Sequence, residues 1–146
     1  MQMWELEVRE SVRQTLADYT AATDGFDLKA LAACFGAEGI LQFTGGQQPL
    51  AGPEAIADGL AAAMSGPRES MRLAPTFVRH HVSSVRFISV AADRVEASSY
   101  FAVYTDIGLD HWGRYRDVLT PIGDRWLFAS RRISVDAFSK ASLMAQ

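Results

Sequence analysis

The chain has 146 residues and lacks several features that would assign it to a secreted or membrane-bound class. It contains a single cysteine, Cys34, which excludes a disulfide within the chain and fits a reducing compartment. No apolar run approaches the roughly 20 residues that a membrane-spanning helix needs. The opening stretch MQMWELEVRE carries acids where a signal peptide has cations and then an apolar block. We therefore expect a cytoplasmic protein that has no membrane partner.

The sequence also lacks the motifs of nucleic-acid, nucleotide and metal sites. The net charge is -3 at pH 7 and no basic run is long enough to follow a phosphate backbone, which argues against nucleic-acid binding. P-loop, GxGxxG and GxSxG motifs are absent. The three histidines, His80, His81 and His111, show neither HExxH nor paired-cysteine spacing. We expect no metal and no cofactor.

Helical patterns fill the first half of the chain. From Trp4 to Thr23, apolar residues recur every three or four positions, which is the period of an amphipathic helix. A short second helix is predicted up to Phe35, with Asp27 as its N-cap. After a short strand from Gly39 to Phe43, a third helix is predicted from Gly52 to about Met64, with proline in its first turn.

The second half of the chain is rich in β-branched and aromatic residues. Four strands are predicted, at Thr76 to Val90, Arg94 to Tyr104, His111 to Leu119 and Trp126 to Val135. Short turns join them, which implies an antiparallel meander. Because no repeat and no linker divides the chain, we expect one α+β domain over residues 1–146. Its helices should cover one face of the sheet and leave a small-molecule pocket between the two layers.

Four stretches form a pattern when they are taken together in their order along the chain. They are the helix end from Tyr19 to Asp24, the helix start Gly52-Pro53-Glu54-Ala55-Ile56, the strand RHHVSSV, and Trp126 followed five residues later by Arg131. This pattern resembles the SnoaL-like branch of the NTF2-like superfamily, over nearly the whole chain. The resemblance implies a cone-shaped α+β fold. In that fold a strongly curved, mainly antiparallel sheet and three helices from the N-terminal half enclose a pocket.

The resemblance also implies a chemistry. The family includes ketosteroid isomerases, scytalone dehydratase, bile-acid dehydratase and polyketide cyclases, beside many domains without known activity. In the eliminating members an Asp at the end of the first helix pairs with a His on the sheet, and these positions match Asp24 and His80. Tyr19 matches a residue that helps the substrate ionise, and Arg131 matches an Arg near the chain end. Ser84 stands where the family has Asn.

The chemistry of these residues agrees with such a site. An imidazole accepts a proton at neutral pH, and a carboxylate on its other nitrogen fixes its tautomer. The phenol of Tyr19 can stabilise negative charge that develops on an oxygen. Asp24 lies at the negative end of a helix dipole, which is unfavourable and therefore favours a functional explanation. Arg131 lies among apolar neighbours and needs a partner, either Asp24 or a substrate oxygen.

Structural explanations also exist for these residues. His80 or His81 can be a strand-end residue that bonds the backbone, Asp24 is a good turn residue, and Tyr19 fits a helix core. Alternation places His80 and Ser84 on one face of the strand and His81 on the other, without deciding which face is covered. Substrate contacts are expected from Ser84, His81, Tyr104, Phe43 and Phe35.

We expect a cofactor-free lyase or isomerase that acts on a hydrophobic cyclic molecule such as a steroid, terpenoid, aromatic or polyketide. Two other classes stay open. One is a binding domain without catalysis, and the other is an association subunit like the small subunit of a ring-hydroxylating oxygenase. A homodimer or homotrimer is expected, with an interface from Trp112, Tyr115 and Phe101. The C-terminal segment either frays or covers the pocket with Phe138 or Leu143.

Overall fold

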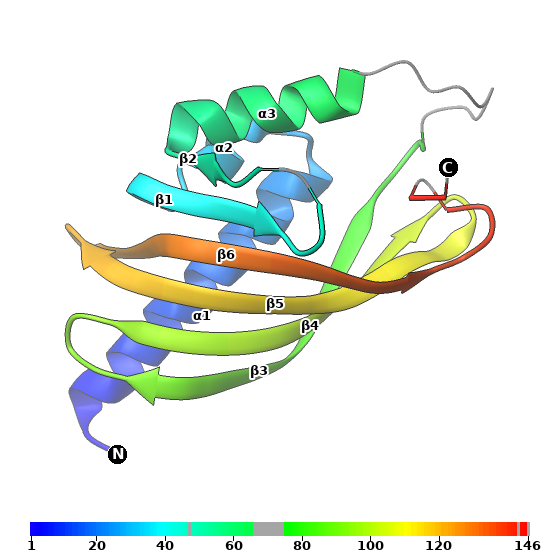
Figure 1. Ribbon diagram of the computed structural model, residues 1–146. Helices are drawn as coiled ribbons and strands as arrows, with labels where there is room; N and C mark the ends of the chain where they lie inside the picture. Colours follow the sequence, from blue (N-terminus) through cyan, green and yellow to red (C-terminus); the bar gives the residue numbers. More distant parts are fainter. Residues whose placement is uncertain (47, 66–74, 143, 146) are drawn as a thin grey trace.

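The computed structural model describes residues 1–46, 48–65, 75–142 and 144–145. Three helices and six strands follow one another along the chain (Figure 1). The helices are α1 (Met3–Asp24), α2 (Leu28–Ala32) and α3 (Pro53–Ser65). The strands are β1 (Phe35–Phe43), β2 (Leu50–Ala51), β3 (Arg79–Val90), β4 (Val95–Thr105), β5 (Gly108–Ile122) and β6 (Arg125–Phe138).

The six strands form one curved sheet in the order β2-β1-β6-β5-β4-β3. Strands β3 to β6 pair antiparallel with their neighbours in sequence, as the meander predicts. The short strand β1 lies parallel to β6, the last strand of the chain, with Leu41 opposite Arg131. The sheet is therefore mainly antiparallel, and its only parallel pairing among the described residues joins the two halves of the sequence.

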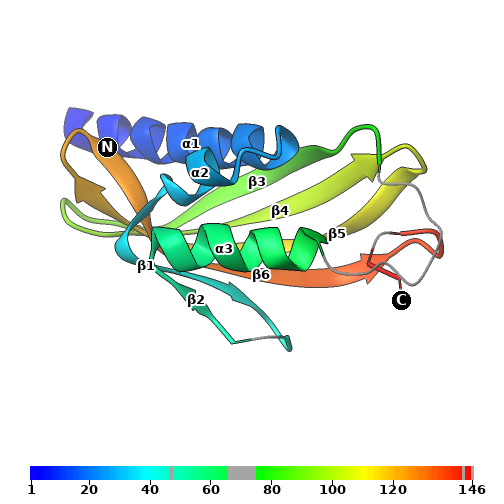
Figure 2. The same cartoon turned by 90° about the horizontal axis from the view of Figure 1, so that it is seen from above.

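One face of this sheet, called the inner face below, is covered by the helices. Figure 2 shows α1 and α3 running along it, and α1 contacts β3 and β6 whereas α3 contacts β1 and β2. Helix α1 buries one stripe of residues against the sheet, and strand β4 buries every second residue from Val95 to Thr105. Apolar residues from both layers form one core; its largest buried members include Phe128, Leu31, Leu41, Ile56 and Leu119.

The α+β prediction is confirmed. The predicted N-cap is also present, since Asp27 accepts a hydrogen bond from the backbone N of Ala30 at 3.0 Å. Strands β1, β5 and β6 are longer than predicted, whereas β3 begins at Arg79 and not at Thr76. The predicted second helix is too long, because α2 ends at Ala32 and Phe35 already belongs to β1. In the ranges described, no helix is long and apolar enough to cross a membrane.

The prediction that Tyr115 and Phe101 contribute to a subunit interface is wrong. Both belong to the core, and their rings stack at 4.6 Å between centroids on the inner face. The error arose because an aromatic residue on a strand can face either side of a sheet. The expected oligomer stays a prediction.

Candidate active site

Asp24 and His80 meet where helix α1 ends and strand β3 begins. The His80 ring nitrogen Nδ1 lies 2.6 Å from Asp24 Oδ1. The backbone N–H of His80 also donates to both carboxylate oxygens, each at 3.1 Å. One carboxylate therefore fixes both the backbone and the ring of His80. These donors also offset the unfavourable position of an acid at the C-terminal end of a helix.

The environment of His80 favours its neutral form. Burial lowers the pKa of His80 from its ordinary value of 6.5, and the hydrogen bond and charge of Asp24 only partly oppose this shift. With Nδ1–H donated to Asp24, the neutral ring carries its lone pair on Nε2. In the described part of the chain, Nε2 has no hydrogen-bond partner, and 12% of the side chain remains exposed. The arrangement leaves a fixed proton acceptor on the inner face.

Tyr19 and Arg131 lie deeper, in the core. The Arg131 side chain is 0% exposed, and its Nε and Nη2 donate to the two oxygens of Asp117 at 2.9 and 3.0 Å. Its guanidinium also stacks on aromatic rings, at 4.3 Å from the Tyr19 centroid and 3.7 Å from the Tyr115 centroid. Burial raises the pKa of Tyr19, although Arg131 opposes this. Tyr19 is thus a buried ring that packs over an ion pair.

The expected pairing of Arg131 with Asp24 is wrong. Asp117 stands directly opposite Arg131 in the antiparallel pairing of β5 and β6, so its carboxylate reaches the guanidinium first. Asp24 is instead bonded to His80. The sequence could not identify Asp117 as the partner, because the pairing depends on the register between β5 and β6.

His81 and Tyr104 lie on the uncovered face of the sheet. Their rings contact each other edge-on at 4.9 Å, and Tyr104 is 40% exposed. The strand pairing explains their place, because His81 alternates with the inward-facing His80. The structure therefore separates the two adjacent histidines and turns His80 inward. Substrate contacts from His81 and Tyr104 on the inner face are not compatible with this geometry.

Ser84 also departs from its expected place. The pairing of β3 with β4 shifts register between Ser83 and Arg86, and Ser84 adopts φ +51°, which is a left-handed conformation. This bulge turns the exposed Ser84 away from the core and brings Val85 inward instead. The prediction that His80 and Ser84 share one face is therefore wrong.

Phe35 and Phe43 lie at opposite ends of β1. Phe35 is buried in the core, with its ring 6.2 Å from the ring of Tyr19 and 5.2 Å from that of Phe128. Phe43 is 37% exposed at the far end of the strand. Phe35 therefore supports the packing below Tyr19, and the substrate contacts predicted for both residues stay a prediction.

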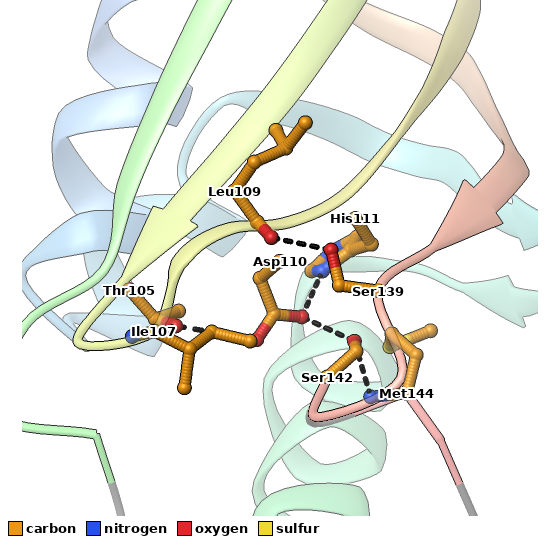
Figure 3. A network of polar contacts seen from close by, with 8 residues as sticks. All are labelled: Thr105, Ile107, Leu109, Asp110, His111, Ser139, Ser142 and Met144. Atoms are coloured by element: carbon orange, nitrogen blue, oxygen red, sulfur yellow. Dashed lines mark hydrogen bonds and ion pairs between the residues drawn. The ribbon is translucent and has the colours of Figure 1, made fainter.

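A second His–Asp pair was missed by the sequence reasoning. Figure 3 shows the contact between His111 and Asp110, in which Nδ1 lies 2.8 Å from Oδ1. Asp110 is buried and also accepts hydrogen bonds from Thr105 and from the Ser142 hydroxyl in the C-terminal segment. The missed signal was the dipeptide Asp110-His111 itself, because the predicted strand began at His111 and left Asp110 in a turn.

The C-terminal segment folds back against the start of β5. The backbone N of Ser139 donates to the carbonyl O of Asp110 at 2.8 Å, and the Ser139 hydroxyl donates to the carbonyl of Leu109 at 2.6 Å. Phe138 is half exposed, and Leu143 lies outside the described residues. Fraying directly after β6 is therefore wrong for residues 139–142.

Two surface hollows are lined by described residues. One lies between α1 and the start of β6, beside Asp18 and Arg125, and the other lies on β1, β5 and β6 beside Gln42 and Arg116. His80 and His111 line neither of them. The expected pocket between helices and sheet stays a prediction.

Comparisons with known proteins agree with this fold. Residues 4–132 match the family of the SnoaL-like domain. No curated protein matches the chain. A solved structure from Catenulispora acidiphila is 27% identical, with a TM-score of 0.78 over 92% of this chain and 96% of that one.

Two further structures come from Novosphingobium aromaticivorans. A putative scytalone dehydratase is 15% identical, with a TM-score of 0.76 over 94% of this chain and 89% of that one. An NTF2-like protein with a cystatin-like fold is 22% identical, with a TM-score of 0.74 over 94% and 87%. At these identities the two structures show a shared fold. Because the match to the SnoaL-like domain covers residues 4–132, the chain belongs to the SnoaL-like family, and it has the NTF2-like, cystatin-like fold of these structures.

Proposed function

We propose that the chain is a lyase or isomerase that removes a proton beside a carbonyl group of a hydrophobic cyclic molecule. His80 is the general base, and Asp24 orients it. The 2.6 Å contact between His80 Nδ1 and Asp24 Oδ1 carries this proposal, because it directs the lone pair of Nε2 toward the inner face. The similarity to a putative scytalone dehydratase supports the substrate class through the shared fold alone.

The charge balance of the step fits the dyad. When Nε2 takes the proton, the imidazolium that forms lies against the Asp24 carboxylate, which compensates its charge. The lowered pKa of His80 keeps the ring neutral, and therefore active as a base, at neutral pH. In this proposal Tyr19 and Arg131 pack in the buried core and do not take part in the proton transfer.

Hydrogen exchange on a simple cyclic ketone tests the base without requiring the natural substrate. The protein is incubated with 1-tetralone in D₂O, and loss of the C2 proton signal is followed by NMR. We expect H80Q to lower the exchange rate by about 10²- to 10⁴-fold, the usual contribution of a general base. H81Q is the matched control and should exchange at the wild-type rate, because His81 lies on the uncovered face.

The pH dependence sharpens the same test. His80 must be neutral to act, and burial lowers its pKa below 6.5, so the exchange rate should stay high at pH 6.5 and fall only at lower pH. Wild-type exchange in H80Q would overturn the proposal. Binding of 1-tetralone without any catalysed exchange would favour a carrier instead.

A further inference from the structure

A basic hollow lies on the uncovered face of the sheet, opposite to the face that carries His80. It has a volume of about 190 Å³ and lies over β1, β6 and β5, which are direct neighbours in the sheet (Figure 1). Its side chains come from two adjacent rows of paired residues, one basic and one largely apolar. Neither row takes part in the proposed proton transfer, so the hollow needs an explanation of its own.

The basic row holds two arginines side by side. Arg116 of β5 is directly opposite Arg132 of β6, and Gln42 of β1 is opposite Arg132 on its other side. The residues that alternate with the arginines, Asp117 and Arg131, are buried on the inner face, so both arginines point outward. The Cβ atoms of directly paired residues lie only about 4.5–5.5 Å apart, and like charges in such positions destabilise a sheet. An anion held between the two guanidiniums would remove this repulsion.

The second row lies two residues away along the strands, a distance of about 7 Å. In this row Ser130 of β6 is opposite Val118 of β5 and Ile40 of β1. Ile40 is 38% exposed although it is apolar, and Val118 is half-buried. The hollow therefore offers two guanidiniums at one side and two apolar side chains at the other, with a serine between the apolar pair.

Positive charge around the hollow exceeds negative charge. The carboxylate of Glu96 lies 3.0 Å from Nη2 of Arg94 and 3.5 Å from Nη2 of Arg116. Within the part of the chain that the structure describes, Arg132 makes no ion pair and no side-chain hydrogen bond. Three guanidiniums therefore share one carboxylate, which leaves an excess of two positive charges. This excess is local, because the net charge of the whole chain is -3.

We propose that this hollow binds a small organic phosphate monoester. The phosphate group lies between Arg116 and Arg132, and the carbon part packs on the apolar row. A phosphate monoester carries about two negative charges at neutral pH, which matches the excess positive charge. Its oxygens can accept hydrogen bonds from two planar guanidiniums at once. A carboxylate brings one charge and two oxygens, so it would balance the arginines less completely.

Titration of the ¹⁵N-labelled protein tests the site at pH 8 in about 0.1 M salt, where the phosphate is a dianion. Phenyl phosphate is the probe; inorganic phosphate lacks its ring, and benzoate lacks its second charge. We expect phenyl phosphate to shift the backbone amide signals of Val118, Ser130 and Arg132 and to bind more tightly than inorganic phosphate. Benzoate should bind at least about 10-fold more weakly, because a hydrogen bond to a charged group is lost. Equal binding of benzoate, or no shift of these amides, would overturn the proposal.

Two variants separate the basic row from the apolar row. R132Q should weaken the binding of both phosphates by at least about 10-fold, since it removes a charged donor. I40S should weaken phenyl phosphate by about 3- to 10-fold and leave inorganic phosphate unchanged, because it removes only apolar contact area. If I40S had no effect on phenyl phosphate, the organic part of the proposed ligand would be wrong.

R86Q is the matched control for the loss of one positive charge. Arg86 is exposed on the same face but outside the hollow, and Ser98 stands between it and Arg116 in the strand pairing. Two strand spacings, about 10 Å, separate the two arginines, and salt screens most of their effect on each other. R86Q should therefore change binding by less than about 2-fold. Equal weakening by R86Q and R132Q would show a general effect of charge and overturn the site.

Thermal unfolding shows whether a variant has lost the site or the fold. Phenyl phosphate should raise the unfolding temperature of the wild type but not that of R132Q. Without ligand, R132Q should be at least as stable as the wild type, because one of two opposed like charges is gone. If R116Q and R132Q abolish self-association measured by sedimentation and phosphate does not bind, the arginines contact a second copy and the proposal is overturned. H80Q should bind phenyl phosphate as the wild type does, so this site and the proposed base fail separately.

Discussion

Two acid–base pairs join distant parts of this chain, and they differ in what they leave open. Arg131 and Asp117 are both 0% exposed, and their contacts run through two hydrogen bonds and stacked aromatic rings. The side chains of Asp24 and His80 are 14% and 12% exposed. The second ring nitrogen of His80, Nε2, has no hydrogen-bond partner in the described ranges. The first pair is closed to solvent, and Nη1 of Arg131 is buried there without a hydrogen-bond partner. The second pair is open, because 12% of the His80 side chain remains exposed.

The two pairs differ in whether their basic group can gain or lose a proton. Burial alone would lower the pKa of Arg131, but Asp117 and the adjacent tyrosines raise it above its ordinary value, so this group does not change its charge. Burial lowers the pKa of His80, so the ring is neutral at neutral pH and becomes charged when it takes up a proton. A charged pair identified from sequence alone could belong to either kind, and only exposure and titration distinguish them.

The largest expected effect comes from breaking the closed pair. R131M leaves the Asp117 carboxylate buried without its partner, and burial then makes the carboxyl take up a proton. We expect the free energy of unfolding to fall by about 3–5 kcal/mol, measured by urea denaturation. The double variant R131M/D117L should recover most of this loss. If R131M alone were as stable as the wild type, the pair would not hold the core.

A smaller effect is expected from weakening the open pair. D24N keeps an oxygen that accepts from His80 but removes the charge, so the unfolding free energy should fall by about 1–2 kcal/mol. The exchange of 1-tetralone should fall much more strongly, because an uncharged partner does not compensate the imidazolium. D18N is the matched control on the same helix. Its exposed contact with Arg125, at 3.4 Å, should contribute less than about 1 kcal/mol.

The smallest effect is expected at Ser84, which was predicted to join the open pair. A left-handed conformation costs a residue with a side chain about 1–2 kcal/mol, and glycine avoids this cost. S84G should therefore raise the unfolding free energy by up to about 1 kcal/mol, after the larger entropy of the unfolded chain is subtracted. Exchange of 1-tetralone should not change. S83G is the control: Ser83 does not adopt the left-handed conformation, so this substitution should be destabilising. A loss of activity in S84G would show that Ser84 belongs to the active site after all.

The sequence predicted what depends on local pattern. The periodic apolar residues of α1 and the β-rich second half led to the α+β class, and Asp27 as N-cap followed from simple helix chemistry. The positions of Asp24 and His80 came from the family resemblance. Their contact is consistent with helix α1 ending beside the start of β3.

The sequence could not predict the bulges at Ser84 and at Asp110. At Ser84 and at Asp110 an extra residue enters one strand, and the neighbouring strand determines where it does so. Each bulge changes which side chains face inward, so strict alternation failed at Ser84 and overlooked Asp110. The partner of Arg131 was missed for a similar reason, because it depends on the register between β5 and β6.

Strand β6 is made after the other five strands, yet it lies inside the sheet, between β1 and β5. During synthesis β1 can pair with β2 early, but its other partner, β6, is still missing. The hydrogen bond from Phe128 N to Cys34 O therefore cannot form until residue 128 has been made. Ordering such distant segments is slow compared with forming neighbouring hairpins. Until then the apolar side of β1 stays exposed, so a ribosome stalled before β6 would leave a nascent chain prone to aggregate.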